Sequence, residues 1–142
     1  MSAIDISDET FIVAPAALLQ RELCDEASWR SLGLSLTCYE DRGVKGKRWR
    51  LVDNLRGTAE VWLEPAGDGV TVHVYVQADL TKPRRWSDPQ KAYSHRIKRR
   101  VLDLKRHYDL QRPAGMPAVP PDGDDAPEDG KLTATNVPTK ES

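Results

Sequence analysis

The side chains best suited to chemistry lie on two neighbouring segments, 58–64 and 70–79. Polar and apolar residues alternate in both, which is typical of half-buried β-strands. One face of the pair collects Glu60, Trp62, His73, Tyr75 and Gln77. Aromatic walls with a few polar anchors are what a ligand pocket requires, if this face points into a cavity. If it points to solvent, the same residues are cross-strand surface pairs. The opposite face of 70–79 is a row of valines, which competes for the core and favours the second alternative.

Motifs for catalysis, metals or cofactors are not found. The chain has no glycine-rich phosphate loop, no nucleophile elbow and no pair of carboxylates at motif spacing. Its two cysteines, Cys24 and Cys38, lack a second Cys/His pair at zinc spacing. We therefore assign no catalytic residue, no metal ligand and no cofactor. The two thiols are expected to be reduced and mostly buried.

Charge is strongly segregated along the chain. Residues 1–80 hold 8 Lys/Arg and 13 Asp/Glu, whereas residues 81–112 hold 11 Lys/Arg against three Asp. Such a basic segment attracts RNA phosphates, anionic lipid head groups or an acidic protein, and a merely solvated helix face is the alternative. The candidate anion-binding residues are Arg84, Arg85, Arg96, Arg99 and Arg100.

The elements that must position these residues follow from periodicity and turn signals. We expect a strand at 4–13, a short helix from Pro15 and a second one at 25–32, closed by Gly33. Strands follow at 35–39, 44–52, 58–64 and 70–79, and their short connections make neighbours antiparallel. Asp88 caps a long helix that reaches residue 112. Its apolar stripe consists of Tyr93, Ile97, Val101, Leu104 and Tyr108.

These elements predict one α+β domain over residues 1–112. Residues 113–142 are rich in proline and hold six acids against two lysines, a composition that predicts a disordered acidic tail. That tail is a potential electrostatic partner of the basic helix. No stretch has the roughly 18 consecutive apolar residues of a membrane span, and no secretory signal is visible. We therefore expect a cytoplasmic protein that is not transmembrane.

The order of elements resembles the START-like helix-grip (SRPBCC) superfamily. The matching residues are Phe11-Ile12-Val13-Ala14-Pro15, followed by Leu18, Leu19, Leu23, Asp25 and Trp29, and then 57–65 running into 69–72. This superfamily includes the polyketide cyclase/dehydrase and lipid-transport proteins of actinobacteria, and the chain resembles that type. The resemblance covers about residues 4–112.

The resemblance implies a curved antiparallel sheet that grips the long C-terminal helix, with a ligand cavity between them. Only four strands separate the helix pair from the last helix, fewer than is usual in the family, so we expect a shortened sheet and a small cavity. The function implied is non-enzymatic binding of a small hydrophobic or lipid-like ligand. Two alternatives are an adaptor that binds RNA, the ribosome or an anionic membrane through the basic helix, and a polyketide cyclase/dehydrase-type enzyme. The candidate ligand contacts are Trp62, His73, Tyr75, Trp49, Tyr93 and Ile97.

Overall fold

A computed structural model describes residues 2–82 and 88–111. Five strands form one antiparallel sheet in the order β1-β5-β4-β3-β2, so the first strand pairs with the last. Two short helices precede β2, and one long helix follows β5. This α+β architecture confirms the fold expected from the sequence, including the four strands between the helix pair and the last helix. The elements are β1 (Ile4–Ile12), α1 (Ala16–Leu23), α2 (Glu26–Arg30), β2 (Ser35–Asp41), the 3₁₀ turn η1 (Gly43–Lys45), β3 (Gly46–Val52), β4 (Leu55–Ala66), β5 (Gly69–Leu80) and α3 (Pro89–Gln111).

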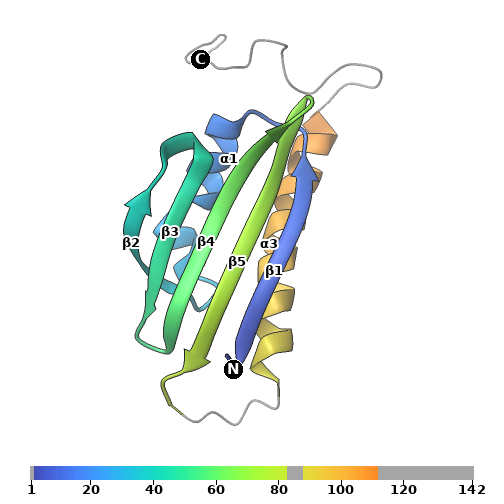
Figure 1. Cartoon of the computed structure of the whole chain (residues 1–142). Helices are drawn as coiled ribbons and strands as arrows, with labels where there is room; N and C mark the ends of the chain where they lie inside the picture. Colours follow the sequence, from blue (N-terminus) through green and yellow to red (C-terminus); the bar gives the residue numbers. More distant parts are fainter. Residues whose placement is uncertain (1, 83–87, 112–142) are drawn as a thin grey trace.

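All three helices lie on the same side of the sheet (Figure 1). The long helix α3 runs behind β1 and β5, whereas α1 and α2 lie behind the other half of the sheet. We call this side the helix face. Within the described residues, no helix covers the opposite side, which we call the open face.

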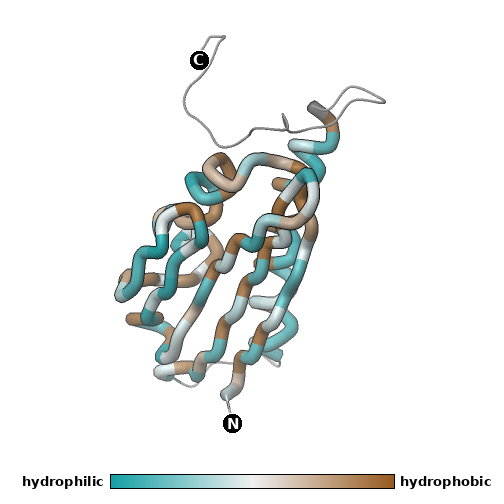
Figure 2. Tube along the Cα trace, turned by 45° about the horizontal axis from the view of Figure 1, so that its top comes forward, coloured by the Kyte–Doolittle hydropathy of each residue, from teal (hydrophilic) through white to brown (hydrophobic). Residues whose placement is uncertain are grey.

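The core lies between the sheet and the helices. Along β5 the valines Val70, Val72, Val74 and Val76 are buried, and they meet the apolar stripe of α3. Figure 2 shows the resulting alternation of hydrophobic and hydrophilic residues along the strands. The valine row therefore belongs to the helix face, and the row that contains His73 belongs to the open face.

Helix boundaries follow the capping signals in the sequence. The Asp25 carboxylate accepts a hydrogen bond from the Ala27 amide at 3.2 Å and begins α2. Asp88 does the same for the Lys91 amide at 3.0 Å and begins α3. Gly33, with φ of 90°, follows α2 in the left-handed conformation that glycine adopts most easily.

The predicted bounds of β2, β3 and β4 need correction. β3 begins at Gly46 rather than at Val44, because residues 43–45 form the 3₁₀ turn η1. β4 begins at Leu55 rather than at Thr58, because Leu55 is buried and continues the ladder with β5 as far as Leu80. Gly57, expected in a loop, lies inside β4. A Cβ atom at this position would come within 2.0 Å of the Gln77 carbonyl oxygen, so the glycine permits the close approach of two strands. The register of β1 against β5 is continuous from Ile4 to Ile12.

A bulge lies in β2. The register of β2 against β3 shifts between Cys38 and Glu40, so Tyr39 is the extra residue. β2 consequently extends to Asp41, two residues beyond its predicted end at residue 39. Cys38 is exposed, contrary to the expectation of two mostly buried thiols, because the edge strand leaves it uncovered.

Candidate functional site

Three of the six predicted ligand contacts lie in the core on the helix face. Trp49, Tyr93 and Ile97 are each at most 1% exposed. The indole nitrogen of Trp49 donates a hydrogen bond to the Glu26 carboxylate at 2.9 Å, and the rest of the ring packs in the core. Tyr93 and Ile97 belong to the α3 stripe that packs on the sheet. These residues hold the helix against the sheet.

The space beneath the helices is filled by side chains. A cavity between α2 and the sheet has a volume of about 10 Å³ and is lined mostly by apolar residues, among them Trp29, Leu34, Trp49 and Val74. A volume of about 10–15 Å³ holds roughly one water molecule. A lipid-like ligand needs far more room, so the expectation that it sits between the sheet and α3 is not supported.

The other three predicted contacts form a row on the open face. The rings of Trp62 and His73 stack with their centroids 4.2 Å apart, and the His73 and Tyr75 centroids are 6.0 Å apart. Trp62 belongs to β4 and pairs directly with His73 of β5. The sheet therefore separates the predicted set into two groups of three on opposite faces, and they do not line a common cavity.

His73 is the centre of a polar network on this face. It is 5% exposed, although no helix covers it. Its Nε2 lies 2.9 Å from Oε1 of Glu64, and its Nδ1 lies 3.2 Å from the Tyr75 hydroxyl and 3.4 Å from Oε2 of Glu9. An ionised carboxylate can only accept hydrogen bonds. Nε2 of His73 therefore carries a proton and donates a hydrogen bond to Glu64. In this neutral tautomer, Nδ1 is an acceptor and the Tyr75 hydroxyl donates to it.

The network fixes how Tyr75 is presented to solvent. Its hydroxyl oxygen lies 3.2 Å from Nδ1 of His73, and the tautomer of the histidine decides which of the two groups donates. Burial, followed by the charges of Glu9, Glu60 and Glu64, raises the pKa of Tyr75 above its usual value. The hydroxyl therefore stays protonated at neutral pH. Tyr75 is a fixed, neutral polar group on the open face.

A groove of about 370 Å³ begins beside Tyr75. This volume lies within the usual range of small-molecule sites, about 300–1,000 Å³. The groove crosses the sheet from β1 to β2, and its wall on the β2 side is the bulged residue Tyr39. The side chains that line it on the open face are Asp5, Ser7, Tyr39, Thr58, Glu60, Tyr75 and Gln77.

Most residues of this groove were not predicted as a set. The sequence placed Glu60, Tyr75 and Gln77 on one face, but it gave no register for β1 or β2. The structure adds Asp5 and Ser7 because Asp5 is paired with Gln77 and Ser7 with Tyr75. The polar residues that alternate with apolar ones at the start of β1 were the signal that could have identified them.

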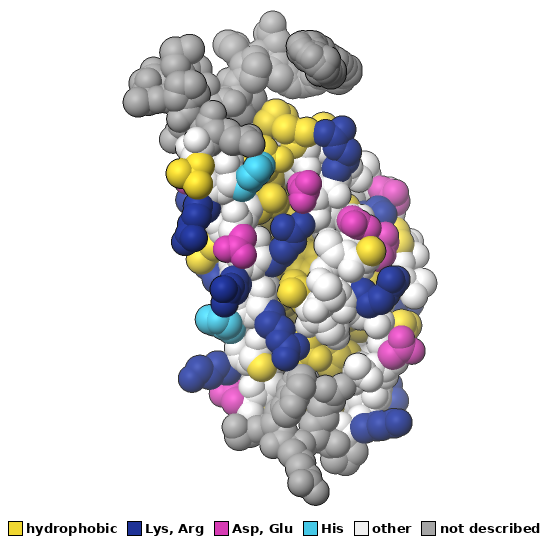
Figure 3. All heavy atoms as spheres, turned by 180° about the vertical axis from the view of Figure 1, so that it is seen from behind, with side chains coloured by type: hydrophobic (Ala, Val, Ile, Leu, Met, Phe, Trp, Pro, Cys, Tyr) yellow, Lys and Arg dark blue, Asp and Glu magenta, His cyan; other side chains and the backbone are white. Residues whose placement is uncertain are grey.

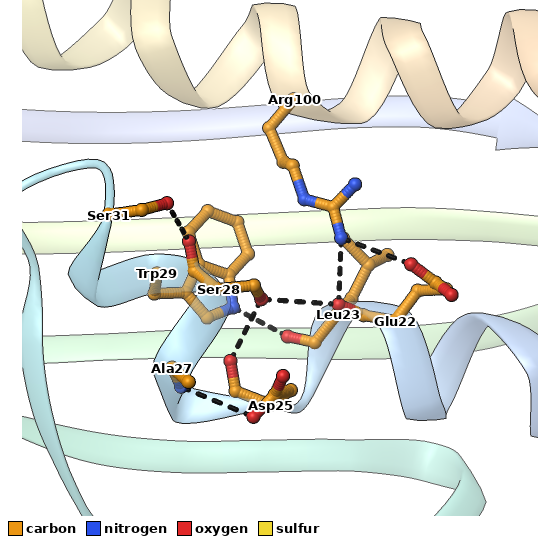
Figure 4. Close-up of polar contacts among 8 residues, drawn as sticks. All are labelled: Glu22, Leu23, Asp25, Ala27, Ser28, Trp29, Ser31 and Arg100. Atoms are coloured by element: carbon orange, nitrogen blue, oxygen red, sulfur yellow. Dashed lines mark hydrogen bonds and ion pairs between the residues drawn. The ribbon is translucent and has the colours of Figure 1, made fainter.

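The cations of α3 are largely used to dock the helix. Lys98 donates to Asp8 at 2.8 Å, and Lys105 donates to the Phe11 carbonyl at 2.8 Å. Arg100 donates to the carbonyl and the carboxylate of Glu22 at the end of α1, at 3.0 and 3.3 Å (Figure 4). Arg96 donates to the Leu32 carbonyl at 3.3 Å. Arg96 and Arg100, two of the predicted anion-binding residues, therefore have structural contacts.

Only part of the predicted anion-binding surface remains available. Arg99, Lys91 and Arg106 are exposed on α3, and within the described residues they have no hydrogen-bond or ion-pair partner. On the side that bears α3, Lys and Arg side chains are interspersed with acidic and apolar ones (Figure 3). Arg84 and Arg85, together with the predicted tail at 113–142, lie outside the described residues.

The described part of the chain contains no candidate metal site and no candidate membrane-spanning helix. Residues 2–82 and 88–111 contain no group of three or more His, Cys, Asp or Glu side chains placed to hold a metal ion. Among these residues, no helix has the length and apolar character that crossing a membrane demands.

Comparison with known proteins identifies solved structures of the same fold. The sequence matches no family model and no curated protein. The structure is similar to DR_A0006 from Deinococcus radiodurans, with 17% identity and a TM-score of 0.58, over 76% of this chain and 98% of that one. It is also similar to the Aha1 dimer from Colwellia psychrerythraea, with 10% identity and a TM-score of 0.58, over 78% of this chain and 99% of that one.

These likenesses show the fold. The described part of the chain has an α+β helix-grip-like fold, with a long C-terminal helix packed across an antiparallel sheet. The likenesses cover nearly the whole of both solved chains. The specific similarity to actinobacterial polyketide cyclase/dehydrase and lipid-transport proteins stays a prediction, because identities of 17% and 10% carry no information on function.

Proposed function

We propose that this domain is a non-enzymatic binding module whose ligand occupies the groove on the open face. The contrast between the two sides of the sheet carries the proposal. The cavity on the helix face holds about one water molecule, whereas the open face has a groove of about 370 Å³ with polar and aromatic walls. A small, polar ligand fits this lining better than the lipid-like ligand that the sequence favoured.

The geometry of the groove supports recognition by hydrogen bonds. Thr58 and Gln77 are neighbours on β4 and β5 and belong to its floor, where they offer a hydroxyl and an amide. Tyr75, held by His73, offers an oxygen of fixed position. Groups that are held in place before binding lose little entropy when a ligand arrives, which favours affinity at an exposed site.

Chemical-shift mapping tests this proposal. ¹⁵N-labelled full-length chain is titrated with a library of small polar fragments and, separately, with the apolar fluorophore Nile red. We expect polar fragments to shift the amides of Ser7, Thr58 and Gln77, and we expect Nile red to leave the amides of Val101 and Leu104 unchanged. Shifts confined to the α3 stripe would instead indicate a ligand on the helix face.

A pair of matched variants locates the site. Thr58→Trp fills the groove, whereas Thr71→Trp adds the same ring at another threonine of the open face, paired with Glu64 and outside the groove lining. Fragment binding should be lost in the first variant and kept in the second. Equal binding by both variants would overturn the proposal.

A second candidate function is binding to a polyanion through Lys91, Arg99 and Arg106. Their lack of partners among the described residues favours it over an interaction through the docked cations. Affinity for a short single-stranded RNA, measured by fluorescence anisotropy, should fall with salt, because phosphate contacts release counterions. Replacing these three residues by alanine should abolish that binding. Alanine at the exposed cations Arg21, Arg30 and Lys45, remote from α3 in sequence, is the control.

A further inference from the structure

A single row of side chains connects two opposite charges across the open face. The ladder pairs Asp5 of β1 with Gln77 of β5, Gln77 with Thr58 of β4, and Thr58 with Arg50 of β3. Directly paired residues in antiparallel strands project to the same side of a sheet. The spacing between strands is about 4.8 Å, so three steps place the two ends of the row about 14 Å apart.

The carboxylate at one end of the row is available to a ligand. Within the described residues, the Asp5 side chain has no hydrogen-bond or ion-pair partner, and the residue is exposed. Its main chain, by contrast, is fixed by the side chain of Gln90 on α3. The Asp5 amide donates to Gln90 at 2.7 Å, and Gln90 donates to the Asp5 carbonyl at 2.9 Å. The row therefore ends at the carboxylate of Asp5, a residue whose main chain is hydrogen-bonded to α3.

The guanidinium at the other end is also exposed. Arg50 lies over the ring of Tyr39, with its central carbon 5.1 Å from the ring centroid. Arg50 does not itself line the groove, but this contact places its guanidinium beside Tyr39, which does. Among the described residues, Arg50 has no carboxylate partner, unlike the neighbouring Arg48, which pairs with Glu40 and Glu60.

The residues between the two charges are neutral and polar. Gln77 and Thr58 each carry a donor and an acceptor, and both are exposed. A ligand that lies along the row therefore meets a negative end, an uncharged hydrogen-bonding middle and a positive end. Electrostatic complementarity of this kind selects both the chemistry and the direction of a ligand.

We propose that the groove binds a short zwitterionic peptide, or a molecule of the same chemistry, across the strands, with its ammonium group at Asp5 and its carboxylate at Arg50. This inference rests on the proposed function of the groove. An extended chain of three residues spans about 10 Å. The two side chains cover the remaining distance of about 4 Å, since both can lean toward the ligand. The peptide amides then face Gln77 and Thr58.

The energetics predict a weak and specific complex. An exposed ion pair contributes up to about 1 kcal/mol, which corresponds to roughly a fivefold change in affinity. Each charged end should therefore matter by about three- to fivefold. Changes of this size are measurable by NMR titration, which tolerates low affinity and reports the fold of each variant at the same time.

The experiment compares trialanine with its two capped forms on the ¹⁵N-labelled full-length chain. We expect trialanine to shift the amides of Thr58 and Gln77, and we expect N-acetylation or C-amidation to weaken binding by about three- to fivefold each. Asp5→Asn should weaken trialanine binding and remove the effect of N-acetylation. Arg50→Gln should do the same for C-amidation. Asp68→Asn and Arg56→Gln, at exposed sites outside the row, are the matched controls.

The outcomes separate this inference from the function on which it rests. Equal affinities for free and capped trialanine would overturn the zwitterion assignment and leave groove binding intact. The same holds if trialanine causes no shift while other polar fragments still shift Ser7, Thr58 and Gln77. If no fragment shifts these amides, the proposed function fails as well.

Discussion

Lys98 of α3 places its ammonium group 2.8 Å from the Asp8 carboxylate of β1, on the side of the sheet that otherwise buries apolar residues. The same ammonium lies 3.0 Å from the hydroxyl of Thr10, which is itself buried. These two polar positions interrupt the apolar alternation of β1, and a single cation satisfies both. Part of the strong positive charge of α3 therefore serves to dock the helix.

The first prediction concerns this docking contact. We expect Lys98→Met to lower the free energy of unfolding by about 1–2 kcal/mol, because Asp8 and Thr10 lose their donor. Urea denaturation followed by circular dichroism measures the change. The matched control is Lys91→Met on the same helix, at an exposed residue without a described partner, and it should change stability by less than about 0.5 kcal/mol. Similar losses in the two variants would contradict the structural role of Lys98.

His73 is predicted to be the main stabilising residue of the open face. His73→Ala removes the ring between Glu64 and Tyr75 and the stacking partner of Trp62, so we expect a loss of about 2 kcal/mol. His95→Ala, at an exposed histidine of α3, should be nearly neutral. Thermal unfolding of the two variants beside the parent chain gives the comparison, and a stable His73→Ala protein would show that the network is dispensable.

Glu26 should give the protein part of its resistance to acid. Burial opposes ionisation of this carboxyl, but hydrogen bonds from Trp49 and Lys47 outweigh it, so the pKa of Glu26 is lowered. A carboxyl with a lowered pKa in the folded state contributes stability above its unfolded pKa of about 4.3, and this contribution is lost as pH falls through the folded pKa.

The test of this contribution is a pH series on Glu26→Gln. Unfolding free energies of both proteins are measured from pH 7 down to about pH 3, which brackets the unfolded pKa. The parent chain should be more stable at pH 7, and the difference should shrink as the solution is acidified below about pH 4. A difference that stays constant over the series would refute the assignment.

The two thiols should differ strongly in reactivity. Burial raises the pKa of Cys24 to about 12, whereas Cys38 is exposed at the edge of the sheet. The thiolate is the reactive form, so a disulfide reagent at mildly alkaline pH should modify Cys38 rapidly and Cys24 only after unfolding. Mass spectrometry after timed labelling distinguishes the two sites. Comparable labelling rates in the native protein would contradict the burial of Cys24.

The same shift predicts the response to alkali. Because the pKa of Cys24 is higher in the folded than in the unfolded chain, the unfolded thiol ionises first as pH rises above about 8.5. The free energy of unfolding should therefore fall between about pH 9 and pH 12. Cys24→Ala should show a shallower fall in the same range, which denaturation at a series of pH values can measure.

Local patterns were sufficient to predict the fold. The β5 alternation, the glycine that closes the second helix (Gly33) and the Asp88 cap each depend on a few consecutive residues, and the structure has all three. The Tyr93–Leu104 stripe was likewise predictable because burial on a helix follows a fixed period. The resemblance to the helix-grip superfamily then predicted how these elements pack on one another.

The site depended on information that no local pattern contains. Asp5 and Arg50 are 45 positions apart in the sequence, and only the register of four strands places them in one row. The bulge that turns Tyr39 toward the groove has no glycine to mark it. The sequence predicted a small cavity on the helix face, but not its volume of about 10 Å³, because that volume depends on how Trp29 and Trp49 pack with the valines of the sheet.

The separation of the two faces has a consequence for how this protein can change over evolutionary time. On β5, residues 72, 74 and 76 hold the helices, whereas residues 73, 75 and 77 belong to the open face. Of the latter, Gln77 can be replaced with little risk to folding, because its exposed side chain supports no buried neighbour. Substitutions at such positions, whether natural or engineered, can therefore change the ligand specificity of the groove without changing the packing of the core.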